Sequence, residues 1–72
     1  MVKRDKRNIG KMVVVVPHGT AMDGRVGKVR RFRGDHSKGN PFVVVQIKNL
    51  NGSWGSAYTF PGSVLEKIKC QK

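Results

Sequence analysis

The sequence predicts an all-β fold, a small five-stranded barrel, and three observations lead to this prediction. The chain has 72 residues, enough for one small domain. From Ile9 onward, β-branched residues recur in short runs that glycine, proline and asparagine separate at roughly ten-residue intervals. No window shows the apolar periodicity of an amphipathic helix.

Five strands are expected, with turn signals between them. They span residues 11–16, 25–32, 42–48, 53–60 and 65–69. The sequences NLNG and FPGS, which begin at Asn49 and Phe60, are typical of tight turns. Two longer loops are expected at 17–24 and 33–41, both rich in glycine and polar residues, and they carry His18 and His36.

Within the third strand, alternation predicts one inward-facing set: Val43, Val45 and Ile47. In the second strand, Val29 and Phe32 are three residues apart. Both can face inward only if the strand bends or bulges around Arg30 and Arg31.

Residues 1–8 carry four basic side chains and almost no apolar ones, so they are expected to form a flexible basic arm before a domain at 9–72. Lysine and arginine number 15 against four acidic residues, giving a net charge of +11. This charge predicts a polyanionic partner, and nucleic acid, an anionic membrane surface and an acidic protein would all fit it.

No part of the sequence has the character of a targeting or spanning segment, because the longest apolar run, Met12 to Val16, is far shorter than the roughly 20 residues of a membrane helix. No membrane insertion is expected. The single cysteine, Cys70, can form no intramolecular disulfide, and no Cys/His cluster suggests a metal. These features favour the reducing cytoplasm.

The segment GKMVVVV followed by DGRVGKVRRF resembles the KOW motif of small SH3-like barrels in ribosomal proteins and NusG-type transcription factors. Six motif positions match: Gly24, Arg25, Val26, Gly27, Lys28 and Val29. In physical terms, Gly24 would relieve the turn, Gly27 would let two strands approach closely, and Val29 would enter the core. The ending FPGSVLEKI also resembles the last strand of SH3-like barrels. The resemblance implies an SH3-like barrel that binds nucleic acid.

The density of basic residues beside a glycine-rich loop favours a nucleic-acid site that contacts phosphates. Trp54 and Tyr58 are four residues apart in one expected strand, so they should share a face. That face is either the core, which is favoured for at least one of the two rings, or a stacking platform for bases. The candidate nucleic-acid-binding residues are Lys3, Arg4, Lys6, Arg7, Arg25, Lys28, Arg30, Arg31, Arg33, Lys38, Trp54 and Tyr58.

Enzymatic activity is not expected, because no nucleophile–base pair is present and the acidic residues are scattered. No cofactor, metal or small-molecule substrate is expected either, and the two histidines are expected to be ordinary polar surface. A resemblance to type II dihydrofolate reductases is limited to Val45, Gln46 and Ile47, with Lys48 where that family has tyrosine.

The sequence therefore predicts a nucleic-acid-binding module, with RNA favoured over DNA, acting alone or in a larger ribonucleoprotein or polymerase complex. One alternative is an accessory subunit that docks on an acidic protein, because photosystem I subunit IV has a similar barrel and second strand. The other is a small regulator bound to polymerase or ribosome.

Overall fold

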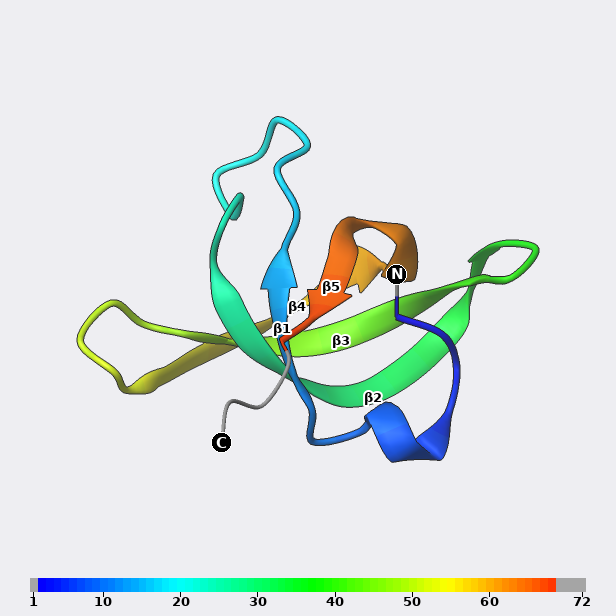
Figure 1. Cartoon of the computed structure of the whole chain (residues 1–72), viewed down its shortest axis with the longest axis horizontal. Helices are drawn as coiled ribbons and strands as arrows, with labels where there is room; N and C mark the ends of the chain where they lie inside the picture. Colours follow the sequence, from blue (N-terminus) through cyan, green and yellow to red (C-terminus); the bar gives the residue numbers. More distant parts are fainter. Residues whose placement is uncertain (1, 69–72) are drawn as a thin grey trace.

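One antiparallel sheet of five strands makes up most of the computed structural model, which describes residues 2–68 (Figure 1). The strands are β1 (Met12–Val15), β2 (Val26–Ser37), β3 (Asn40–Lys48), β4 (Trp54–Pro61) and β5 (Leu65–Lys67). Their order in the sheet is β4-β3-β2-β1-β5, and every neighbouring pair is antiparallel. Two short 3-10 helices are present, η1 (Lys6–Asn8) and η2 (Gly62–Val64). The predicted all-β fold with five strands is confirmed.

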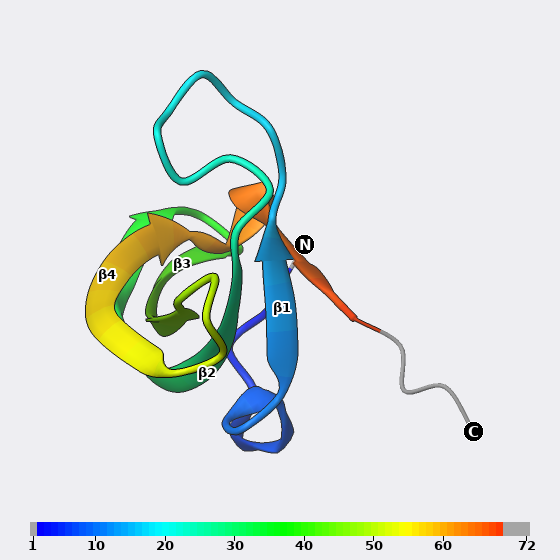
Figure 2. The ribbon, with the colours of Figure 1, turned by 90° about the vertical axis from the view of Figure 1, so that its left-hand side faces the viewer.

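The sheet curls strongly, so that β4 and β1 face each other across the space that the concave side encloses (Figure 2). Within residues 2–68, no strand ladder joins β4 to β5, and η2 makes the connection instead. Among the described residues the sheet is therefore strongly curled, and strand pairing does not close it into a barrel.

The strand boundaries agree with the expected ones to within one residue, except between β2 and β3 and at the end of β5, whose last residue is Lys67. Residues 33–41 were expected to form a loop, but β2 continues to Ser37 and β3 begins at Asn40. The turn is only Lys38 and Gly39, and Gly39 has a φ of 75°, which glycine adopts without strain. The loop prediction is wrong there because a two-residue turn lets the polar segment pair as a hairpin. Residue 69, the expected end of the last strand, lies outside the described residues.

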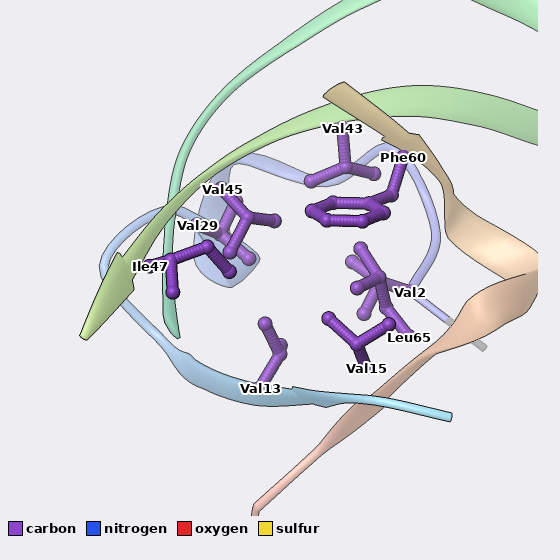
Figure 3. Packing of buried hydrophobic residues seen from close by; sticks show 9 residues of the cluster. All are labelled: Val2, Val13, Val15, Val29, Val43, Val45, Ile47, Phe60 and Leu65. Carbon is purple, nitrogen blue, oxygen red and sulfur yellow. The ribbon is translucent and has the colours of Figure 1, made fainter. Parts of the chain in front are cut away.

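The core is a cluster of aliphatic side chains, mainly valines, with one aromatic ring, Phe60, beside Val43 (Figure 3). Its members are Val2, Val13, Val15, Val29, Val43, Val45, Ile47, Phe60 and Leu65. The inward-facing set predicted for the third strand is therefore confirmed. Phe32 and Val64 are partly buried and pack against this cluster.

A bulge in β2 places both Val29 and Phe32 on the inner side, as the sequence predicted. Val29 pairs with Val45 and Arg31 with Val44, so the register shifts by one residue at this point. Val29 is fully buried and Phe32 packs against the core. The extra residue leaves Arg30 and Arg31 exposed on the outside of the bend.

Residues 2–8 pack on the domain, in contrast to the flexible basic arm that the sequence predicted for residues 1–8. Val2 is fully buried in the core cluster, and its N–H donates to the Gly62 carbonyl oxygen at 3.0 Å. A Cβ on Gly62 would collide with the Val2 carbonyl oxygen. Asn8, at the end of η1, is also buried. The buried Val2 side chain and its backbone hydrogen bond to Gly62 together anchor the start of the segment.

At Gly27, β2 lies too close to β3 for any side chain to fit, which agrees with the role expected from the sequence. A Cβ built on Gly27 would lie 2.5 Å from Val45 Cγ1 and 2.7 Å from the Gln46 carbonyl oxygen. Because one of these atoms is backbone, the clash cannot be relieved by a rotamer change alone.

Replacing Gly27 by valine should therefore lower the free energy of unfolding by at least about 2 kcal/mol. Gly34→Val is the matched control, because Gly34 lies in the same strand and a Cβ there would have no neighbour within 4 Å. Urea unfolding followed by circular dichroism measures both. Equal midpoints for the two variants would contradict the close approach.

Val2→Ala should cost about 2 kcal/mol of stability, because it removes two buried methyl groups and leaves a cavity. Ile9→Ala serves as the control, since Ile9 follows the same segment but is 47% exposed. Thermal melts of both variants measure the difference. A melting temperature as high as that of the unmodified protein would show that Val2 does not anchor the segment.

Candidate nucleic-acid interface

The convex side of β2, β3 and β4 presents a surface that we call the outer face. Strand pairing arranges it in rows, because directly opposed residues lie on the same side of a sheet. The rows are Arg31–Val44–Thr59, Lys28–Gln46–Ala57 and Lys48–Trp54. Its small side chains leave a shallow hollow of about 410 Å³ lined by Arg30, Arg31, Val44, Gln46 and Ala57.

Trp54 lies at one end of the outer face with two ammonium groups against its ring. Lys28 Nζ is 5.0 Å from the ring centroid and Lys48 Nζ is 5.9 Å from it. Both distances are within the range of a cation–π interaction. The tryptophan is 41% exposed, so part of the ring remains open to solvent.

The expectations for the two aromatic residues of β4 are corrected by the structure. Neither ring is in the core: Trp54 is 41% exposed and Tyr58 is 44% exposed. Valines, Ile47, Leu65 and Phe60 fill the interior instead. Nor do the rings share a face. Tyr58 pairs with the inward-facing Val45, whereas Trp54 pairs with Lys48 beyond a register shift that reverses the alternation.

The predicted cations of β2 divide between the outer face and the hairpin. Lys28, Arg30 and Arg31 lie on or beside the outer face. Arg25, just before β2, donates from Nη2 to the Lys48 carbonyl oxygen at 3.2 Å and so lies next to it.

Two further candidates lie towards the β2–β3 turn, away from Trp54. Arg33 is exposed in the distal part of β2, and Lys38 occupies the turn itself. Lys48 belongs to the outer face but was not among the candidates. The signal for it in the sequence is strand alternation, because Lys48 lies two residues after Gln46 and so on the side opposite to Val45 and Ile47.

The N-terminal candidates lie elsewhere, and two of them are already paired with carboxylates. Arg4 Nη2 is 2.9 Å from Asp35 Oδ1, and the same guanidinium also donates to the Arg33 carbonyl oxygen. Arg7 Nη2 is 2.9 Å from Asp5 Oδ2.

The other two N-terminal candidates are not among the residues that line the hollow of the outer face. Lys3 lines a separate hollow, and Lys6 begins η1. The structure therefore does not bring the twelve candidates together on one surface.

The loop before β2 is organised around Asp23. This carboxylate accepts hydrogen bonds from the backbone N–H groups of His18, Gly19 and Thr20 at 3.1, 2.9 and 3.2 Å, and from the Thr20 hydroxyl at 3.1 Å. Partial burial acts to raise the pKa of Asp23, but these hydrogen bonds outweigh it and hold the pKa below its ordinary value. The fixed loop positions Arg25, whose N–H donates to the Met22 carbonyl oxygen at 3.0 Å.

Neither a metal cluster nor a membrane-spanning helix is found in the part of the chain that the structure describes. Residues 2–68 contain no group of three or more His, Cys, Asp or Glu side chains that could hold a metal ion. No helix among them has the length and apolar character needed to cross a membrane. His36 packs its ring edge-to-face on Phe42 at 5.2 Å.

Comparison of the chain with protein-family models, with curated proteins and with solved structures finds no match. The KOW resemblance therefore stays a prediction from the sequence. What the structure defines is a small all-β domain with a curved, cation-bearing outer face.

Because its pKa is lowered in the folded state, Asp23 stabilises the protein above its unfolded-state pKa of about 3.9, and this contribution is lost as the pH falls through the lower folded value. Asp23→Asn should therefore lower the melting temperature at neutral pH, with the difference shrinking below about pH 4. Thermal melts across that range provide the measurement. A difference that stays constant with pH would show that the charge of Asp23 is not what organises the loop.

Proposed function

We propose that this protein binds single-stranded nucleic acid on the outer face, contacting phosphates with its lysines and arginines and stacking a base on Trp54. The observation that carries this proposal is the half-exposed Trp54 ring with Lys28 and Lys48 beside it. Proteins that bind single-stranded nucleic acid commonly combine exposed aromatic rings, on which bases stack, with cations that contact the phosphates.

The charge of this region supports a polyanionic ligand. Residues 26–61 contain six basic residues and a single acidic one, Asp35. That carboxylate is engaged by Arg4, so it does little to offset the positive potential of the outer face. A phosphate backbone would neutralise the excess charge and release counterions on binding.

Stacking a base on Trp54 is energetically compatible with the lysines that now contact the ring. An exposed cation–π contact contributes about 0.5–1 kcal/mol, whereas a stacked base contributes about 1–3 kcal/mol. A base can therefore displace one ammonium from the ring, and the freed lysine remains close enough to pair with a flanking phosphate.

The stacking step also favours an unpaired strand over a duplex, because the bases of a duplex already stack on one another. The preference for RNA over DNA is supported by the KOW resemblance alone. The same surface would serve a protein that acts alone or within a ribonucleoprotein complex.

Trp54 is the only tryptophan, so its fluorescence reports on the proposed site directly. Titration with a single-stranded RNA oligonucleotide should quench this fluorescence. Trp54→Ala has no tryptophan left to report, so its binding is followed by the fluorescence anisotropy of a dye-labelled oligonucleotide; it should weaken binding by about 1–3 kcal/mol while leaving the salt dependence unchanged. Tyr58→Ala is the matched control, because Tyr58 is similarly exposed but lies on the other face of β4.

In the same experiment, the double variant Arg30→Ala/Arg31→Ala should reduce the slope of log affinity against log salt by about 0.7 for each phosphate that the variant no longer neutralises. An unchanged affinity and slope in this variant, together with full binding by Trp54→Ala, would refute the site. Polyglutamate that bound as tightly as RNA would instead favour docking on an acidic protein.

A further inference from the structure

A second basic hollow lies among residues that do not belong to the outer face. It has a volume of about 490 Å³ and is lined by Lys3, Asp5, Arg7, Asn8, Lys11 and Lys67. These residues come from the N-terminal segment, the residue before β1 and the end of β5. We call this hollow the N-terminal pocket.

The lining of the N-terminal pocket is strongly cationic. Four of its side chains are basic and only Asp5 is acidic. Asp5 is held by the Arg7 side chain and the Arg7 backbone N–H, and the hydrogen bond from the Arg7 side chain is the main cause of the lowered pKa of Asp5. Asp5 therefore stays ionised at neutral pH, and its charge is offset by Arg7. The charges of Lys3, Lys11 and Lys67 remain to attract an anion.

Asn8 gives this pocket a fixed wall. Its side chain is buried, its Nδ2 donates to the Lys3 carbonyl oxygen at 2.8 Å, and its Oδ1 accepts from Lys67 Nζ at 3.3 Å. These two bonds determine which way the amide points and hold one ammonium group in place. The segment itself is anchored through Val2, so the lysines are presented by a packed structure. A site built in this way loses less conformational freedom when it binds a ligand.

We propose that the N-terminal pocket binds a phosphate group through Lys3, Lys11 and Lys67. Ammonium groups are compact charges with three donors each, which suits a tetrahedral oxyanion that accepts from several directions. The volume is many times the roughly 30 Å³ of one water molecule, so a hydrated phosphate fits. The phosphate comes either from the backbone of a nucleic acid or from free phosphate or a phosphomonoester.

This inference does not rest on the proposed function, because the pocket and the outer face have no residue in common. Loss of binding at one surface therefore leaves the other testable in the same protein.

The test is an NMR titration of the full chain with inorganic phosphate, with sodium chloride keeping the ionic strength constant. Saturable shifts are expected at the Asn8 side-chain amide and at the backbone amides of Lys3, Lys11 and Lys67. Lys11→Gln/Lys67→Gln should weaken phosphate binding by at least about fivefold. Arg33→Gln/Lys38→Gln removes the same charge at the β2–β3 hairpin and should leave the affinity within about twofold.

Thermal melts give a second readout that does not depend on signal assignment. Phosphate should raise the melting temperature of the unmodified protein above that in chloride, and at the same phosphate concentration it should raise that of Lys11→Gln/Lys67→Gln by clearly less. Both lysines are exposed, so the double variant is expected to fold.

A parallel titration with the single-stranded oligonucleotide identifies the source of the phosphate. If nucleic acid supplies it, the oligonucleotide shifts the same signals and inorganic phosphate competes. If free phosphate or a monoester is the ligand, only inorganic phosphate shifts them. Shifts that fail to saturate with either ligand, or that saturate with unchanged affinity in Lys11→Gln/Lys67→Gln, overturn the proposal. Trp54→Ala should leave phosphate binding intact, which separates failure of the pocket from failure of the outer face.

Discussion

The close approach of β2 to β3 at Gly27 is the constraint on which the rest of the fold depends. The Gln46 carbonyl oxygen and a Val45 methyl group occupy the space that any side chain at position 27 would need. Because Gly27 has no side chain, β2 can lie close to β3 at this point. Two residues further on, the bulge turns Val29 and Phe32 to the same side. Close approach and bulge together curl the sheet around a core built mainly of valines.

Curvature also explains the nature of the outer face. The buried apolar side chains of β1–β3 lie mostly on the concave side. The convex side therefore carries cations, short side chains and the ring of Trp54, which the register shift in β4 places there. Side chains on a convex surface diverge, which produces a shallow hollow instead of a deep cleft. Such a surface suits a flexible chain that lies across it, and its interactions are charge pairing and stacking.

Much of this fold follows from local sequence patterns. The spacing of β-branched runs indicated the five strands, and the three-residue separation of Val29 and Phe32 implied the bulge, because both observations depend only on neighbours along the chain. The length of the β2–β3 hairpin did not follow. Its residues resemble a loop in composition, and their pairing depends on main-chain hydrogen bonds and a positive φ at Gly39. The prediction that Trp54 and Tyr58 share a face was wrong for a related reason. It assumed regular alternation along β4, and no local sequence pattern indicated the register shift in the β3–β4 ladder.

The N-terminal segment was the hardest part to predict, and its contacts connect the stability of the domain with its charge. Val2 packs in the core cluster and donates a hydrogen bond to Gly62, and both contacts join residues far apart in the chain that no local sequence pattern connects. Arg4 forms an ion pair with Asp35, the one acidic residue of β2. The segment therefore also neutralises a negative charge on the strand that carries most of the outer-face cations. Deleting the segment would remove a core residue, open the N-terminal pocket and free Asp35 at the same time. Reduced nucleic-acid binding after such a truncation would therefore not show that the segment contacts nucleic acid, and only single substitutions in Val2, Arg4 or Lys3 separate these three contributions.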